Sequence, residues 1–128
     1  MERDTVQRRA IRAAIEQADR PLSPQEVLEM AQTDVPKLGI ATVYRTLKGL
    51  VAEDWLQPVS LPGEAPRYER ADKHHHHHFH CRHCGRAYDI EGCPQNLQDM
   101  LPEDFQLEDH DVTLYGQCAA CTHGEPPS

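Results

Sequence analysis

The fold is decided by residues 40–70, which read IATVYRTLKGLVAEDWLQPVSLPGEAPRYER. In the first part of this stretch, apolar side chains recur at the spacing of one buried helix face. This stripe consists of Ile40, Val43, Leu47, Leu50 and Val51. After Trp55 the periodicity changes, and two short extended runs, 56–61 and 67–70, flank a turn that contains proline and glycine. The stretch therefore predicts a helix followed by a β-hairpin.

Two further helices are predicted on the N-terminal side of this stretch. Small and apolar residues recur at helical spacing over residues 5–18, and the opposite face is rich in arginine. For the second helix, Ser23 is the expected N-cap and Pro24 the first helical residue. Glu26 completes a capping box, and the helix is expected to end near Ala31. Three helices followed by a hairpin describe a winged helix.

The helix that begins at Ile40 is the candidate DNA-contacting element. In a winged helix, one helix presents its exposed face to the major groove of DNA. Outside its buried stripe, this helix carries side chains that can donate hydrogen bonds to phosphates and bases and can contact thymine methyl groups. The candidate DNA-binding residues are Thr42, Tyr44, Arg45 and Lys48. The alternative is an ordinary solvated helix face, and the combination with the hairpin favours DNA binding.

The composition changes near Ala71, which predicts a boundary between two domains, 1–70 and 71–128. Residues 1–70 hold 10 basic and 11 acidic side chains, whereas residues 71–128 hold 3 and 10, together with all 9 histidines and all 5 cysteines. The formal net charge of −8 argues against nucleic-acid binding in general. The basic residues of the first part could still form a local DNA-contacting patch.

Size and hydropathy exclude several classes of protein. A chain of 128 residues is too short for a large enzyme. The mean hydropathy of −0.71 and the lack of a long apolar run argue against a transmembrane span. The first nine residues, MERDTVQRR, lack the apolar stretch of a secretory signal, so we expect a cytoplasmic protein without a membrane partner. Cytoplasmic thiols stay reduced, and the cysteines are therefore expected to bind metal rather than to form disulfides.

Four of the cysteines form two C-x2-C pairs, Cys81 with Cys84 and Cys118 with Cys121, separated by 33 residues. Four thiolates at this spacing are typical of a tetrahedral zinc site. A thioredoxin-like redox pair is the alternative, but it needs only one C-x-x-C and leaves the second pair unexplained. We therefore predict a closed structural zinc site that contributes to the folding of the second domain.

An uninterrupted histidine run, residues 74–78, lies directly before the first cysteine pair. Purification tags lie at chain ends, so this internal run belongs to the protein. If the run enters a β-strand, alternation places His75 and His77 on one face and His76 and His78 on the other. One strand could then supply two different metal sites. Imidazole binds zinc, iron and manganese ions with loose selectivity, so the pattern does not choose the metal.

Three stretches of the sequence, in order, carry a family resemblance: IATVYRTL (40–47), HHHHHFHCRHCG (74–85) and DHDVTLYGQCAAC (109–121). They are similar to the recognition helix, the histidine strand with its cysteine pair, and the final strands of the ferric uptake regulator family of bacterial metal-responsive repressors. That family includes zinc, manganese and peroxide regulators. The resemblance implies an α+β protein, with an N-terminal winged-helix DNA-binding domain and a small α/β dimerisation domain. It further implies a homodimer and metal-promoted binding to palindromic, usually A·T-rich, double-stranded DNA operators.

The resemblance also implies two ligand sets besides the four cysteines. A sensory site would use Glu69, His76, His78 and Asp89. An accessory site would use His75, His77 and His110, where His77 replaces an aspartate that is common in the family.

The sequence departs from the family pattern at two places. Many members have a histidine ligand just before the second helix, whereas this chain has Arg20 and Pro21, neither of which can ligate. Around the position of an accessory-site glutamate, this chain has only residues 94–96, Pro-Gln-Asn, with the unpaired Cys93 close by. Cys93 is either a spare thiolate ligand or a small buried core residue.

The function that this combination predicts is a repressor that senses a divalent metal ion, without catalysis. Zinc is the expected structural ion and the first choice for the sensed ion, because histidine and thiolate ligands dominate. Iron or manganese is the alternative, since Glu69 and Asp89 supply harder oxygen ligands, and peroxide sensing would use much the same residues. A hydrolytic metalloenzyme would need an open site and often an H-E-x-x-H helix, which is absent. A metal storage or delivery protein would have no use for a winged helix.

Overall fold

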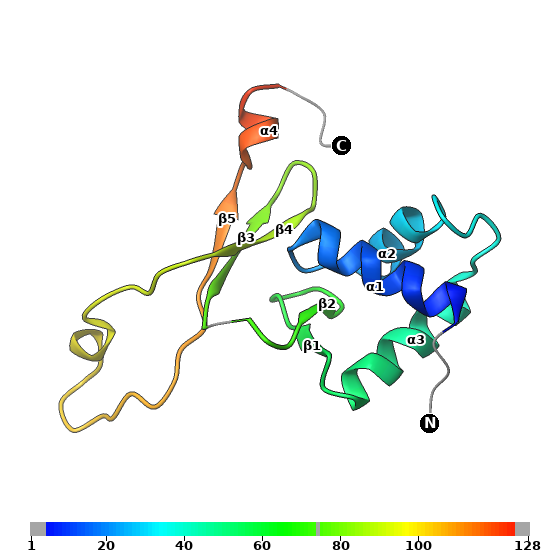
Figure 1. The fold of residues 1–128 in the computed structure, drawn as a ribbon. Helices are drawn as coiled ribbons and strands as arrows, with labels where there is room; N and C mark the ends of the chain where they lie inside the picture. Colours follow the sequence, from blue (N-terminus) through cyan, green and yellow to red (C-terminus); the bar gives the residue numbers. More distant parts are fainter. Residues whose placement is uncertain (1–4, 74, 125–128) are drawn as a thin grey trace. The chain divides into compact units, whose positions relative to one another are not determined.

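The chain divides into two compact units, Met1–Lys73 and His74–Ser128. The computed structural model describes residues 5–73 and 75–124 of these units (Figure 1). The first unit contains α1 (Val6–Ala18), α2 (Pro24–Ala31), α3 (Ile40–Ala52), β1 (Leu56–Val59) and β2 (Arg67–Arg70). The second contains β3 (His77–Cys81), β4 (Ala87–Ile90), the short 3-10 helix η1 (Leu97–Met100), β5 (Thr113–Gly116) and α4 (Ala119–Thr122). None of the helices in the described part of the chain has the length and apolar character that a membrane crossing needs.

The first two helices begin at side-chain caps. Thr5 caps α1, because its hydroxyl oxygen accepts a hydrogen bond from the Arg8 backbone N–H at 3.1 Å. The predicted capping box of α2 is confirmed: the Ser23 hydroxyl accepts from the Glu26 N–H at 3.1 Å, and the Glu26 carboxylate accepts from the Ser23 N–H at 3.0 Å. Two backbone donors that the helix itself leaves without partners are thereby satisfied.

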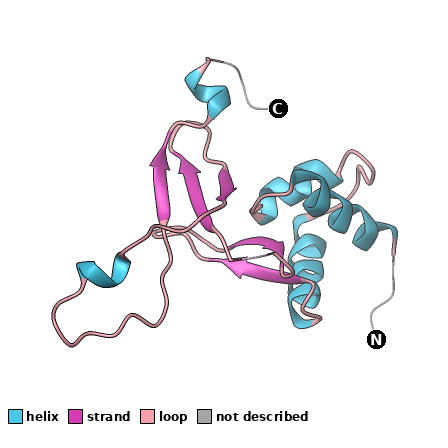
Figure 2. Cartoon of the chain, turned by 60° about the vertical axis from the view of Figure 1, so that its left-hand side comes forward, coloured by secondary structure: helices cyan, strands magenta, loops and turns pink. Residues whose placement is uncertain are grey.

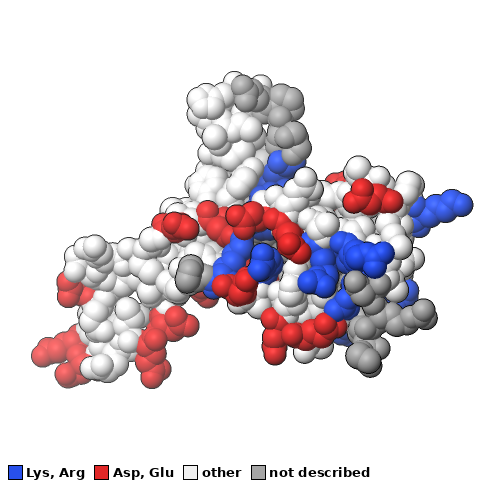
Figure 3. All heavy atoms as spheres, in the orientation of Figure 1, with Lys and Arg blue, Asp and Glu red and all other residues white. Residues whose placement is uncertain are grey.

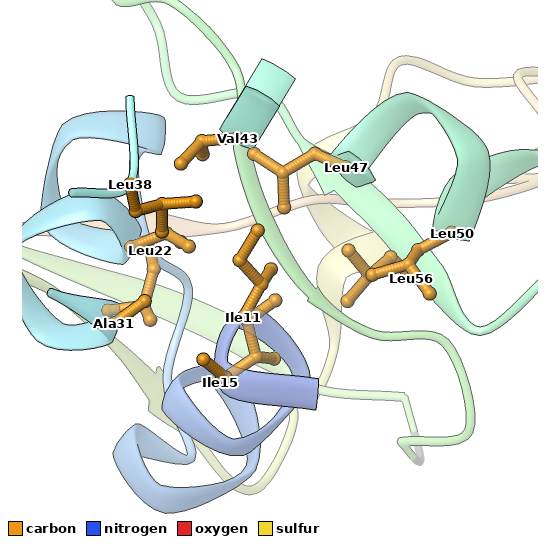
Figure 4. Close-up of a cluster of buried hydrophobic side chains, with 11 residues drawn as sticks. Ile11, Ile15, Leu22, Ala31, Leu38, Val43, Leu47, Leu50 and Leu56 are labelled. Carbon is orange, nitrogen blue, oxygen red and sulfur yellow. The ribbon is translucent and has the colours of Figure 1, made fainter. Parts of the chain in front are cut away.

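The core of the first unit is built by one face of each helix and by the hairpin (Figure 4). Its fully buried members include Ile11, Ile15, Leu22, Val27, Val43, Leu47, Leu50 and Leu56. The predicted stripe of α3 is confirmed at Val43, Leu47 and Leu50, but it is wrong at Ile40, which is 39% exposed. Ile40 is the first residue of α3 and lies beyond the end of this core. Burying side chains of this size stabilises the unit by about 1.5–3 kcal/mol each.

The predicted hairpin is formed by β1 and β2, which pair antiparallel from Leu56 opposite Arg70 to Val59 opposite Arg67. The first extended run was expected to reach Leu61, but β1 ends at Val59. Leu22, between α1 and α2, exchanges two backbone hydrogen bonds with Tyr68 of β2, at 2.9 and 2.8 Å. The hairpin is therefore tied to the helices and completes a winged helix.

The second unit is a three-stranded sheet in which β3 lies between β4 and β5 (Figure 2). Strand β3 pairs antiparallel with β4, with His78 opposite Asp89, and parallel with β5, with Cys81 opposite Gly116. The histidine run was expected to enter a strand; β3 begins at His77, and His74 lies outside the described residues. Helices and strands in one small chain confirm the predicted mixed α+β class.

A long segment, residues 91–112, connects β4 to β5 and contains only η1 as regular structure. Its side chains are mostly exposed, including Met100 and Phe105. Gln98 holds it together by donating to the Phe105 carbonyl at 2.7 Å and accepting from the Leu107 N–H at 2.9 Å. Acidic side chains gather on the part of this segment that lies far from the sheet (Figure 3). Because this long segment is exposed, the second unit has few buried apolar side chains. Within residues 75–124 they are those of Cys81, Ala87 and Cys118.

Candidate metal centres

The four cysteines of the two C-x2-C pairs lie together in the second unit, with their sulfur atoms within 4.8 Å of one another. Cys81 ends β3, Cys84 lies in the turn before β4, and Cys118 and Cys121 lie at the start and within α4. The Sγ atoms of Cys81 and Cys121 are 3.7 Å apart, and those of Cys84 and Cys118 are 3.8 Å apart. A disulfide would bring two sulfurs to about 2.05 Å. A tetrahedron of sulfurs around zinc, with bonds of about 2.3 Å, has edges of about 3.8 Å. The cluster therefore fits a zinc ion.

Backbone N–H groups already point at one of these sulfurs. The Sγ of Cys81 accepts from the Cys84 N–H at 3.4 Å and from the Cys118 N–H at 3.3 Å. Burial raises the pKa of Cys81, but these N–H donors and that of His83 outweigh it and lower the pKa to about 5. A thiolate at Cys81 is the form that a metal ion binds.

A second cluster joins β3 to β4 through His76, His78 and Asp89. The Nε2 atoms of His76 and His78 lie 3.1 and 3.4 Å from the same carboxylate oxygen of Asp89. The centroids of the two imidazole rings are 4.8 Å apart, and the rings are arranged edge to face. Two ligands bound at about 2.0–2.1 Å in a tetrahedral site lie about 3.4 Å from each other, so the three side chains fit around one ion.

Glu69, the fourth residue of the predicted sensory set, belongs to β2 in the first unit. Its side chain is only 1% exposed. One of its oxygens accepts from the Gln57 side chain at 3.5 Å, and the other lies 3.9 Å from the Lys73 ammonium group.

A third cluster brings together His75, His77 and His110, the residues of the expected accessory site, and also Cys93. The three ring centroids are 4.7–5.1 Å apart. Burial and then the neighbouring charges of His75 and His110 lower the pKa of His77, which favours the neutral ring that binds metals. The predicted alternation is confirmed in these two histidine clusters, since His75 and His77 meet in one and His76 and His78 in the other.

The sequence left the role of Cys93 open between a thiolate ligand and a buried core residue. The core interpretation is wrong, because Cys93 is exposed. Its Sγ lies 3.5 Å from the Nε2 of His77. No spacing motif joins Cys93 to the histidines, so the sequence could offer it as a ligand only through its place near the accessory-site glutamate of the family.

Arg20 and Pro21 occupy the positions at which the family resemblance leads one to look for a histidine ligand. The guanidinium group of Arg20 donates to the Glu26 carboxylate at 2.9 Å. Pro21 is buried. The corner before α2 therefore offers no metal ligand at these positions.

The candidate DNA-contacting residues lie on α3 in the first unit. Tyr44 is 55% exposed, and Arg45 and Lys48 are exposed as well. Thr42 is half-buried, and its hydroxyl accepts from the Arg45 guanidinium at 3.2 Å. These side chains point away from the core that Val43, Leu47 and Leu50 enter.

The family model of the ferric uptake regulators matches residues 2–115. The chain belongs to the ferric uptake regulator (Fur) family. The ferric uptake regulation protein of Campylobacter upsaliensis is 32% identical over 124 residues, which cover 93% of this chain and 80% of that relative.

Two solved structures of Fur family proteins are similar over most of the chain. One is a zinc-bound manganese uptake regulator, with a TM-score of 0.79 and 27% identity, covering 91% of both chains. The other is the Helicobacter pylori ferric uptake regulator Fur, whose structure reveals three functional metal binding sites. It has a TM-score of 0.68 and 25% identity, and the match covers 94% of this chain and 82% of that one.

The resemblance that the sequence bears to this family is confirmed. Membership of the Fur family also defines the general activity of this chain. Fur family members are metal-responsive transcription regulators, and this chain is one of them. Regulators of this family bind DNA and are dimeric. The chain also has candidate metal sites of its own, in the three clusters described above.

Proposed function

We propose that this Fur family member is a zinc-responsive repressor that acts as a cytoplasmic homodimer and controls metal-homeostasis genes. The observation that carries this proposal is the prearranged cluster of His76, His78 and Asp89, whose donor atoms approach one another at 3.1 and 3.4 Å. We assign metal sensing to this cluster together with Glu69. The four cysteines hold a structural zinc, and His75, His77 and His110 form an accessory site.

The two units have different roles in this proposal. The first unit binds DNA through Thr42, Tyr44, Arg45 and Lys48, and the second binds metal and dimerises. Glu69 precedes His76 by only seven residues, and the two lie in different units. An ion that takes ligands from both restricts the angle between the units. Metal binding then shifts the population toward dimers whose two α3 helices fit successive half-sites of a palindromic, A·T-rich operator.

The donor atoms favour zinc as the sensed ion. Two imidazole nitrogens and one carboxylate oxygen at the spacing of ligands on one ion suit zinc, which has no geometric preference of its own and accepts four ligands readily. Iron or manganese is the second candidate, because Glu69 and Asp89 are hard oxygen donors. The relative from Campylobacter upsaliensis bears the name of a ferric uptake regulator, which also favours this second candidate.

The test is a DNA-binding titration with protein that keeps only its structural zinc. Operator sequences are first selected from a random duplex library in the presence of zinc. Binding of the selected DNA is then measured against buffered free Zn(II), Mn(II) and Fe(II) at fixed salt. We expect Zn(II) to promote binding at the lowest free concentration. A response to Fe(II) or Mn(II) alone would favour the second candidate, and binding that ignores all three ions would refute metal-dependent repression.

A further inference from the structure

We propose that Cys93 is the fourth ligand of the accessory site, which is thereby a site of three histidines and one thiolate that selects zinc over iron and manganese. The ligand atoms of His75, His77, Cys93 and His110 all lie within 4.8 Å of one another. This inference rests on the accessory site of the proposed function. It is independent of which ion controls DNA binding.

The distance between sulfur and nitrogen in this cluster is that of two ligands on one ion. In a tetrahedral zinc site, with a sulfur at about 2.3 Å and a nitrogen at about 2.0–2.1 Å, these atoms lie about 3.6 Å apart. The Sγ of Cys93 and the Nε2 of His77 are 3.5 Å apart.

A second, independent observation comes from His110. Its Nε2 atom is buried and has no hydrogen-bond partner within the described part of the chain. A buried ring nitrogen without a partner is costly, and native structures rarely keep one without a bound ion or water. The rings of His75 and His77 lie 5.1 and 4.9 Å from that of His110, so an ion at the centre of the cluster satisfies this nitrogen.

The orientation of His77 shows what the ion replaces. The Val112 backbone N–H donates to the Nδ1 of His77 at 3.2 Å, so the proton of the neutral ring lies on Nε2, on the side of the Cys93 sulfur. An ion bound at Nε2 would take the place of this proton, which would then lie on Nδ1, and the Val112 N–H would lose this acceptor.

The donor set explains the selectivity. The four side chains offer three imidazoles and one thiolate but no carboxylate. Thiolate favours zinc, whereas manganese prefers oxygen ligands. The ion would also join three parts of the second unit, because Cys93 and His110 lie near the two ends of the 91–112 segment, His77 begins β3, and His75 lies two residues before it. Metal binding therefore fastens both ends of this segment to the sheet.

The decisive experiment uses Co(II) as a spectroscopic substitute for zinc in the full chain. The four-cysteine site is first filled with zinc, and weakly bound ions are removed with a chelator. Because the sensory cluster has no sulfur, a sulfur-to-cobalt charge-transfer band in the near ultraviolet can arise only from Cys93. We expect this band in the wild type, its loss in Cys93→Ser, and its retention in the control variant His76→Ala.

Two further measurements keep the inference falsifiable if Cys93→Ser changes the fold. Zinc should slow alkylation of Cys93 in the wild type by at least tenfold, and Cys93→Asp should bind an ion at this site without the charge-transfer band. The preference of the site for Zn(II) over Mn(II) should fall at least tenfold in Cys93→Asp. A band that persists in Cys93→Ser, or alkylation that zinc does not slow, overturns the inference. A wild-type band with no effect of metal on DNA binding would instead refute the proposed repressor function alone.

Discussion

At the scale of single residues, the chemistry of this protein depends on the side to which each histidine points at the start of β3 and in the two residues before it. Consecutive side chains of a strand point to opposite faces, and the structure gathers His75 with His77 and His76 with His78. The alternation of side chains predicts this separation from the sequence. It does not predict that Cys93 lies beside His75 and His77, because that position depends on the path of the chain after β4, where the sequence has no periodic pattern.

The first residue-scale prediction separates the two histidine faces. His76→Ala removes one imidazole from the cluster with Asp89, so metal-dependent DNA binding should be lost while the structural zinc and the dimer remain. His75→Ala is the matched control on the opposite face and should change the metal response range more mildly. Both variants are measured by operator binding against buffered metal, with zinc content and sedimentation as checks. A His76→Ala protein that responds at the wild-type concentration would place sensing elsewhere.

A second residue-scale prediction concerns DNA contacts on α3. Tyr44 and Arg45 are exposed, so their truncation to Ala should leave the fold intact and weaken operator binding. Loss of a base contact from Arg45 should cost about 1–3 kcal/mol and relax the preference at one position of each half-site. Gln17→Ala, an exposed change on α1, is the control. Wild-type affinity of both α3 variants in a salt-controlled titration would show that α3 does not read the operator.

At the scale of elements, the sequence predicted helices better than strands. Helices α2 and α3 have caps or long periodic stripes, and their starts at Pro24 and Ile40 are confirmed. The strands are only four or five residues long, so one residue at an end is a large fraction of each. The expected run to Leu61 ends two residues earlier in β1, and Ile40 fits the periodic stripe although the core does not extend to it. Tertiary packing decides where a strand ends and how far the core extends, and the periodicity of a sequence carries no information about tertiary packing.

The element-scale prediction concerns the cap of α2. Ser23→Ala removes the hydroxyl that accepts from the Glu26 N–H, and it should lower the free energy of unfolding of the first unit by about 1 kcal/mol. Trp55 is the single tryptophan and lies half-buried in this unit, so its fluorescence during urea unfolding reports this unit specifically. Ser60→Ala, an exposed serine outside any helix, should be neutral. An equal loss in both variants would argue against the cap as the cause.

At the scale of the whole molecule, the two units are stabilised by different means. The first unit has a core of eleven buried apolar side chains, from Ala10 to Leu56. Among the described residues of the second unit, two of the three buried apolar side chains, Cys81 and Cys118, belong to the four-cysteine cluster. Within one chain, so small a core offsets little of the conformational entropy of ordering 91–112 and three strands. We therefore expect the second unit to depend on its metal, as its few apolar residues suggested from composition alone.

The prediction at this scale is that Cys118→Ser unfolds the second unit and leaves the first unit folded. Three remaining thiolates hold zinc less tightly, and the ion joins the end of β3 to the start of α4, so its release should unfold the second unit and abolish the dimer. Elemental analysis should show loss of the structural zinc, together with any ion held elsewhere in the second unit, and sedimentation should show monomers. Cys93→Ser, outside this cluster, should keep that zinc and the dimer. The urea midpoint followed by Trp55 should stay unchanged in both variants, because the first unit has its own core. A Cys118→Ser protein that retains its zinc and its dimer would remove the four-cysteine assignment, whereas a lost Trp55 transition would show that the first unit cannot fold without the second.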